Sequence, residues 1–330
     1  MSGMGRRDFV ALLGGTAATW PLAARAQSSL PVIGFLNIGS PETWANYLGG
    51  FRQGLNQTGY TENANVAIEY RWARGQYDRL PALATELAER KVTVIAANGG
   101  SRSALAAKAA TATIPIVFTF GDGDPVKHGL VSSINQPGGN VTGVTMIAGA
   151  LEPKRLELLR EVMPKASAIH MLVNPTNAGV AQDIPEVAAV AKGLGLVFEV
   201  IPASTETEIG AAFEKMAQQR AQALMVANDG FLTIRAAQIA ALAIRHALPT
   251  IFPWREQATA GGLISYGTNI REAYRQSGIY VGEVLKGAKP SELPVQQPTK
   301  FDLVVNLTTA KVLGIEIPMS LLLRADEVIE

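Results

Sequence analysis

The chain has 330 residues, of which 48% are hydrophobic and 17% charged, and its 29 Lys and Arg residues nearly balance its 28 Asp and Glu residues. A near-neutral charge argues against a general nucleic-acid-binding protein, because such a protein needs a basic surface. The chain has no Cys, which excludes disulfides, thiolate catalysis, Cys-ligated zinc and a lipid anchor carried on Cys.

Residues 1–26 have the features of an export signal. Arg6 and Arg7 form a twin-arginine pair, an apolar run follows over residues 10–20, and Ala26 ends a small–x–small cleavage pattern. The apolar run is too short to span a bilayer about 30 Å thick. We therefore expect a protein exported to the periplasm and cleaved after Ala26, with no membrane insertion of the mature chain. An uncleaved amphipathic tail is the alternative.

Two successive sets of strands and helices follow the signal. Short β-branched runs predict strands over 31–36, 65–70, 92–96 and 114–120, with helices near 43–58, 77–90 and 101–111. The second set has strands over 168–173, 196–201, 223–227 and 250–252, and helices near 152–163, 180–193, 205–220 and 231–246. Apolar strands that alternate with helices indicate parallel sheets covered on both faces. The fold class is therefore α/β, with two lobes of similar size.

The break between the two sets is predicted at a Gly-rich turn over 136–143. A strand over 263–266, a helix near 270–286, a Pro-rich extended segment over 290–298 and a strand over 301–305 form a tail that is too small for a third domain. We expect this tail to complete both lobes.

The predicted N-terminal lobe comprises 27–145 plus about 268–292. The predicted C-terminal lobe comprises 146–267 plus about 293–330. Such an arrangement makes the chain cross between the lobes more than once, which produces a hinge with a cleft beside it.

Polar residues gather where the predicted strands end, which is where parallel sheets bind ligands. The candidate ligand-binding residues are Ser40, Ser101, Asp122, Asn174, Asn177, Asp229 and Tyr266. An Asp at such a place can hold an ammonium group, and a helix N-terminus headed by Ser can hold a carboxylate. The two together suit a zwitterion such as an amino acid. Each polar residue is also explained as a turn or a helix cap, and an aromatic residue there as core or hinge packing.

Motifs for catalysis or for cofactors are missing. The three histidines, His128, His170 and His246, have no metal-ligand spacing. The sequence around Ser101 resembles a nucleophile elbow but lacks its last Gly, and there is no phosphate-binding loop. We therefore expect no catalytic residue, no metal and no cofactor, and a protein that is not an enzyme.

Several longer stretches resemble the substrate-binding proteins of ABC importers, in the branch with the periplasmic-binding-protein type I fold that serves tryptophan and tyrosine importers. The stretches that carry the resemblance include PVIGFL at 31–36, NVAIEYRW at 65–72, PGGNVTG at 137–143, GGLISYG at 261–267, LKGAKP at 285–290 and RADEVIE at 324–330. They extend over nearly the whole chain after the signal.

The resemblance implies two Rossmann-like lobes, three crossovers and closure around a ligand. It also implies delivery to a membrane permease driven by an ATPase, and ligand contacts from the loops around Ser40, Ser101, Asp122, Asn174 and Asp229. The expected function is capture of a small solute by a monomer. The expected solute is an amino acid or a related small carboxylate, with aromatic ones included. A sensory module for a membrane receptor and an exported hydrolase are the alternatives. Relatives are often lipid-anchored, whereas this chain has no Cys.

Overall fold

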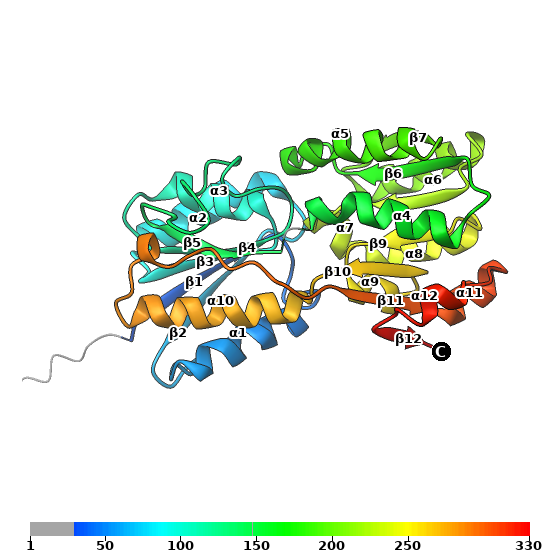
Figure 1. Ribbon diagram of the computed structural model, residues 1–330. Helices are drawn as coiled ribbons and strands as arrows, with labels where there is room; N and C mark the ends of the chain where they lie inside the picture. The colour runs from blue at the N-terminus through cyan, green and yellow to red at the C-terminus, as the bar shows by residue number, and fades with distance from the viewer. Residues whose placement is uncertain (1–29, 147) are drawn as a thin grey trace, which may run out of the picture. The chain divides into compact units, whose positions relative to one another are not determined.

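The structure, a computed structural model, describes residues 30–146 and 148–330, and residues 31–330 form one compact unit. The export signal predicted over residues 1–26 lies outside the described residues. The compact unit contains two β-sheets with helices packed on them, shown in Figure 1.

The first sheet has the strand order β2-β1-β3-β4-β5, and all its neighbouring strands are parallel. Its strands are β1 (Val32–Asn37), β2 (Ala67–Trp72), β3 (Val94–Asn98), β4 (Ile116–Phe120) and β5 (Val141–Thr145). The helices between these strands are α1 (Ala45–Gln57), α2 (Leu80–Glu89), which follows the 3-10 turn η1 (Tyr77–Arg79), and α3 (Ser101–Ala110). Every residue of β3, β4 and β5 is buried, as expected for parallel strands covered on both faces.

The second sheet has the order β12-β11-β10-β9-β8-β6-β7. Its strands are β6 (Ala168–Val173), β7 (Val197–Pro202), β8 (Ala223–Val226), β9 (Thr250–Phe252), β10 (Ile264–Gly267), β11 (Asp302–Asn306) and β12 (Glu327–Ile329). Its helices are α4 (Glu152–Val162), α5 (Ala178–Gly193), α6 (Glu206–Gln218), α7 (Gly230–Ile234), α8 (Ala236–Arg245), α9 (Arg255–Thr259), α11 (Leu307–Leu313) and α12 (Met319–Leu322). The pair β10–β11 is antiparallel, and the other pairs are parallel.

The chain passes between the sheets after β5, after β10 and again before β11. After β10 it returns to the first sheet as α10 (Ile270–Leu285), which lies beside α1 (Figure 1). Two glycines permit this close approach. A Cβ on Gly54 of α1 would overlap the backbone carbonyl of Arg275, and one on Gly278 of α10 would overlap the carbonyl of Phe51. Gln296 then donates its backbone N–H to Gly143 O at 2.9 Å, so the segment up to Gln296 still runs along β5.

The structure confirms the α/β class with two mostly parallel sheets and corrects two local expectations. The turn predicted over 136–143 includes the start of β5, and the helix predicted over 231–246 is interrupted at Arg235 between α7 and α8. The tail pairs antiparallel with β10, and it adds α11, α12 and β12, which were not predicted. The lobe boundaries stay a prediction, because residues 31–330 form one unit.

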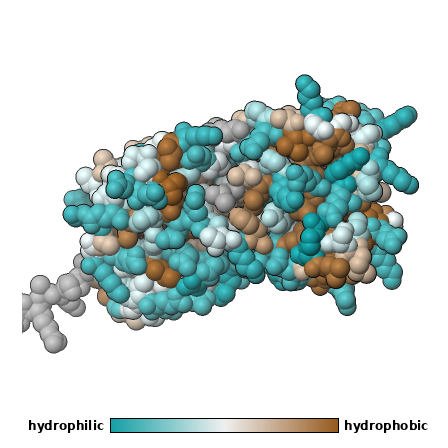
Figure 2. Space-filling model, viewed as in Figure 1, coloured by the Kyte–Doolittle hydropathy of each residue, from teal (hydrophilic) through white to brown (hydrophobic). Residues whose placement is uncertain are grey.

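Hydrophilic residues cover most of the face shown in Figure 2, with hydrophobic residues interspersed among them. The most exposed large apolar side chains are Leu323, Met319 and Val312, near the C-terminal end of the chain. Scattered apolar residues of this kind are normal on protein surfaces. Among the described residues, no helix combines the length and the apolar character needed to cross a membrane.

Candidate ligand-binding site

Buried polar residues from the two sheets meet at the carboxyl ends of their strands. In the first sheet, Ser101 begins α3 and Asp122 follows β4. Ser101 donates its backbone N–H to Asp122 Oδ1 at 2.8 Å and its hydroxyl to Asp122 Oδ2 at 2.7 Å. The N–H at the start of α3 is therefore already bonded to a carboxylate of the protein, where the sequence suggested a place for the carboxylate of a ligand.

Asn177 links this pair to the second sheet. Its side-chain amide donates to Asp122 Oδ2 at 2.8 Å and to Asp229 Oδ2 at 3.0 Å. Asp229 also accepts hydrogen bonds from Asn174 Nδ2 at 3.2 Å and from the hydroxyl of Tyr77 at 2.8 Å. Tyr77, Ser101, Asp122, Asn174, Asn177 and Asp229, here called the inter-sheet network, thus form a continuous set of hydrogen bonds between the sheets.

Two residues of the inter-sheet network also cap helices. Asn177 Oδ1 accepts from the backbone N–H of Gly179 at the start of α5, and Asp229 Oδ1 accepts from that of Leu232 in α7. Side-chain caps of this kind satisfy N–H groups that have no partner within the helix. The capping and the functional interpretations of these residues are therefore compatible.

Both carboxylates are deeply buried, with 3% of Asp122 and 1% of Asp229 exposed. Burial raises the pKa of Asp122 and of Asp229, although the hydrogen bonds that each accepts act in the opposite direction. Neither carboxylate forms an ion pair within residues 30–146 and 148–330. Among the described residues, neutral donors satisfy these two buried acids. Burial above all, and then the two acids, raise the pKa of Tyr77.

A narrow cavity of about 30 Å³ lies beside the inter-sheet network, and we call it the aromatic cavity. It is lined by Trp44, Gly99, Gly100, Phe120, Gly121, Asp122, Met146, Asn228, Gly230, Thr233, Trp254, Ile270 and Tyr274. Trp44 precedes α1 on the first sheet and Trp254 precedes α9 on the second. The described lining contains a carboxylate but no Lys, Arg or His, so the cavity suits a flat apolar group that carries a positive charge.

A buried ion pair supports one wall of the aromatic cavity. Arg155 and Glu152 are at most 1% exposed, and their Nη1 and Oε1 atoms lie 2.9 Å apart. Glu152 Oε1 also accepts from the backbone N–H of Asn228 at 3.1 Å, and Arg155 Nε donates to the carbonyl of Tyr266 at 2.7 Å. The pair therefore connects a residue of the cavity wall to the end of β10, where the chain crosses to the first sheet.

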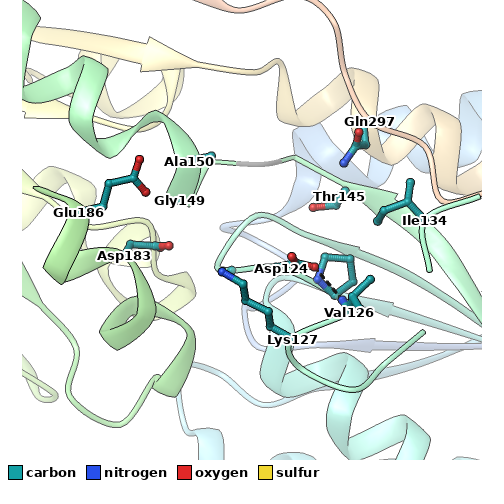
Figure 3. Close-up of a pocket in the computed structure, with 12 residues that line it drawn as sticks. Asp124, Val126, Lys127, Ile134, Thr145, Gly149, Ala150, Asp183, Glu186 and Gln297 are labelled. Carbon is teal, nitrogen blue, oxygen red and sulfur yellow. Dashed lines mark hydrogen bonds between the residues drawn. The ribbon is translucent and has the colours of Figure 1, made fainter. Parts of the chain in front are cut away.

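A second, larger cavity of about 280 Å³ is shown in Figure 3. Asp124 and Lys127 line it from the segment after β4, and Asp183 and Glu186 line it from α5. In Figure 3 the side chains of Lys127 and Asp183 point toward one another. Burial and neighbouring carboxylates raise the pKa of Asp183 to about 7. This cavity is rich in charge, and the described residues that line it include no aromatic side chain.

Five of the seven predicted site residues, namely Ser101, Asp122, Asn174, Asn177 and Asp229, come together in the inter-sheet network. The other two lie elsewhere. Ser40 hydrogen-bonds Thr43 and does not cap α1, whose N-cap residue is Trp44. The ring of Tyr266 lies 6.1 Å from that of Phe301, and Tyr266 is not among the residues that line the aromatic cavity. Whether any of the seven contacts a ligand stays a prediction.

Sequence reasoning missed Tyr77 and Tyr274. Both lie in helical turns, at the start of η1 and in the second turn of α10, so no strand end pointed to them. The only available signal was the position of Tyr274 in the helix that follows a crossover. Within the described part of the chain, no group of three or more His, Asp or Glu side chains is arranged to hold a metal ion.

Comparisons with known proteins agree with this architecture. The chain is 27% identical over 269 residues to a tyrosine-binding protein of Clostridioides difficile. The aligned region covers 81% of this chain and 76% of that protein. A conserved domain protein of Vibrio cholerae has a TM-score of 0.83 at 26% identity, and it covers 91% of this chain and 99% of that one.

A Streptococcus pneumoniae domain solved in complex with L-Trp has a TM-score of 0.82 at 24% identity, over 91% of this chain and 100% of that one. These neighbours confirm the periplasmic-binding-protein type I fold. A family model for ABC transporter substrate binding proteins matches residues 33–329. That family binds solutes, and the prediction that the protein is not an enzyme is confirmed. The chain belongs to the ABC transporter substrate-binding protein family.

Proposed function

We propose that the protein captures an aromatic amino acid in the aromatic cavity. The observation that carries this proposal is the combination of aromatic walls, formed by Trp44, Phe120, Trp254 and Tyr274, with the single carboxylate of Asp122. Aromatic faces attract flat rings and cations, and a buried carboxylate favours an ammonium group. The tyrosine-binding relative and the L-Trp complex support the same ligand class.

Entry of such a ligand requires the two sheets to separate. The aromatic cavity has a volume of only about 30 Å³, whereas ligand pockets typically have roughly 300–1,000 Å³. The inter-sheet network holds the two walls together through hydrogen bonds such as Tyr77–Asp229. The arrangement in which these hydrogen bonds join the two walls is here called the closed arrangement. A ligand that contacts both walls favours the closed arrangement over an open arrangement in which the walls are apart.

Capture is proposed to serve import. The family membership supports delivery of the ligand to an ABC permease and its ATPase. The twin-arginine pair Arg6–Arg7 and the cleavage pattern ending at Ala26 support export, with the mature monomer acting in the periplasm. Replacement of both arginines by Lys should keep the protein in the cytoplasm, as measured by cell fractionation. Export that continues unchanged would contradict the twin-arginine route.

Ligand binding is tested by titration of the purified protein with L-tyrosine, L-tryptophan and L-phenylalanine, with L-leucine and D-glucose as controls. A ligand at 100 times its dissociation constant should stabilise the native state by about 2.7 kcal/mol, which a thermal melt detects. Binding should also change the fluorescence of Trp44 and Trp254, because both line the cavity.

Two Trp-to-Phe variants provide a matched comparison. Trp254→Phe should weaken binding, whereas Trp72→Phe should not, because Trp72 lies on β2 away from the cavity lining. Failure of every aromatic amino acid to bind, after unfolding and refolding to remove any co-purified solute, would overturn the proposal. Uptake of labelled ligand by cells with and without the gene then tests the transport role.

A further inference from the structure

The hydroxyl of Tyr274 accepts two hydrogen bonds and has no acceptor for its own proton among the described residues. Trp44 Nε1 donates to it at 2.6 Å, and Asn37 Nδ2 donates at 3.1 Å. Tyr274 is 1% exposed, and it lines the aromatic cavity. A buried hydroxyl normally finds a partner for its proton, because an unmade hydrogen bond is costly.

The direction of both hydrogen bonds is fixed by chemistry. An indole N–H can only donate, so Trp44 cannot accept the proton of Tyr274. Asn37 Oδ1 accepts from the backbone N–H of Gly39 at 2.7 Å, which turns the NH₂ group of the amide toward Tyr274. The phenol must therefore accept from both neighbours, and its proton has no acceptor among the described residues.

We infer that Tyr274 donates its hydroxyl proton to an acceptor oxygen of the bound ligand. Tyr274 thereby selects ligands that carry an acceptor oxygen beside it. This inference rests on the proposed function and adds a specificity-determining residue to it. An aromatic amino acid has two suitable oxygens, in the α-carboxylate and, in tyrosine, in the ring hydroxyl. The requirement for an acceptor is the same in both cases.

The charge on another part of the cavity lining favours Tyr274 as the partner of the ligand's acceptor oxygen. An anionic oxygen is repelled from Asp122, and the N–H of Ser101 that could have held it is bonded to that carboxylate. Asp122 Oδ1 accepts this single hydrogen bond from the described residues, so it retains a lone pair for an ammonium group. The cavity thus offers an acceptor at Asp122 and a donor at Tyr274.

Four related ligands and one variant test the inference. L-tyrosine carries both oxygens, L-phenylalanine only the carboxylate, tyramine only the ring hydroxyl, and phenethylamine neither. Tyr274→Phe should weaken L-tyrosine binding about 10- to 100-fold, as expected for one hydrogen bond to a polar or charged group. Phenethylamine binding should not change. Loss for L-phenylalanine but not for tyramine identifies the carboxylate as the acceptor, and loss for tyramine but not for L-phenylalanine identifies the ring hydroxyl.

A structural role for Tyr274 would weaken all four ligands by the same factor, and that result would overturn the inference. The matched control is Tyr47→Phe, which changes a neighbouring buried tyrosine whose ring lies 5.7 Å from that of Tyr274 but which does not line the cavity. It should preserve the order of the four affinities.

If Tyr274→Phe does not fold, the wild-type protein still decides the matter. Phenethylamine must then bind at least about 10-fold more weakly than L-tyrosine, and equal affinities would overturn the inference. Failure of all four ligands to bind would instead overturn the proposed function on which the inference rests.

Discussion

The hydroxyl of Tyr77 donates a 2.8 Å hydrogen bond to Oδ2 of Asp229, and the two residues belong to opposite sheets. Tyr77 precedes α2 on the first sheet, and Asp229 caps α7 on the second. This contact forms only when the sheets approach one another. It therefore contributes to the closed arrangement without any need for Tyr77 to contact a ligand, since Tyr77 is not among the residues that line the aromatic cavity.

Tyr77→Phe should weaken ligand binding. The ring stays in place, but the closed arrangement loses one hydrogen bond to a buried carboxylate, worth about 1–2 kcal/mol, while the open arrangement loses nothing. Affinity should fall roughly 5- to 30-fold, as measured by isothermal titration calorimetry, and small-angle scattering should detect a larger radius. The control is Tyr60→Phe, whose hydroxyl has no hydrogen bond within the described residues. Equal affinities of the two variants would contradict the role of Tyr77.

Arg155→Met should destabilise the protein strongly. Arg155 is 0% exposed and pairs with Glu152, so its removal leaves a buried carboxylate without a cation. Breaking a buried pair in this way costs about 3–5 kcal/mol, which urea denaturation measures. Lys154→Met on the same helix removes an exposed pair with Glu157 and should cost less than about 1 kcal/mol. Similar losses of stability for the two variants would show that burial of the Arg155 pair does not determine the size of the loss.

Local sequence patterns were sufficient to predict the α/β fold and most of its elements. The strand predicted over 168–173 coincides with β6, because a β-branched run between polar segments specifies a buried strand. β5 was missed because it follows the Gly-rich Pro137–Asn140 segment and contains Gly143, which made it resemble a turn. Tertiary pairing with β4 overrides these local signals.

The candidate site was predicted only in part, because strand ends are visible in a sequence but contacts between distant helices are not. Asp122 and Asp229 follow strands and were found for that reason. Tyr77 lies 152 positions before Asp229, and Tyr274 lies 230 positions after Trp44. Nothing local in either helical turn indicates those partners. Ser40 does not cap α1, because this helix begins later than predicted, at Ala45, and a contact of Ser40 with a ligand stays a prediction.

Gly54→Ala should destabilise the contact between α1 and α10. A Cβ at this position would overlap the backbone carbonyl of Arg275, and backbone cannot move aside as a flexible side chain can. We expect a loss of about 1–3 kcal/mol, typical of overpacking. Gly49→Ala in the same helix is the control, because a Cβ there meets nothing within 4 Å, and the better helix propensity of Ala should add up to about 1 kcal/mol. Thermal and urea melts compare the two variants, and destabilisation by both would contradict the packing explanation.

Asp183 should make the stability of the protein depend on pH. Burial, together with Glu152, Asp122 and Glu186, raises the pKa of Asp183 to about 7 from 3.8, and Arg155 acts against this. Because the folded state holds the proton more tightly than the unfolded state, the contribution of Asp183 to stability is full below about pH 4 and is lost as the pH rises through about 7. Between pH 5 and pH 8 the loss should be about 2 kcal/mol, since partial exposure reduces the full value.

Asp183→Asn isolates this contribution, because Asn resembles the protonated acid at every pH. The melting temperature of the variant should fall less between pH 5 and pH 8 than that of the wild type, while the other buried acids contribute equally to both. Glu186→Gln, one turn further along α5 at an exposed position, should retain the pH dependence of the wild type. Parallel pH profiles for the wild type and Asp183→Asn would show that Asp183 titrates in its ordinary range and that the cavity in Figure 3 does not raise its pKa.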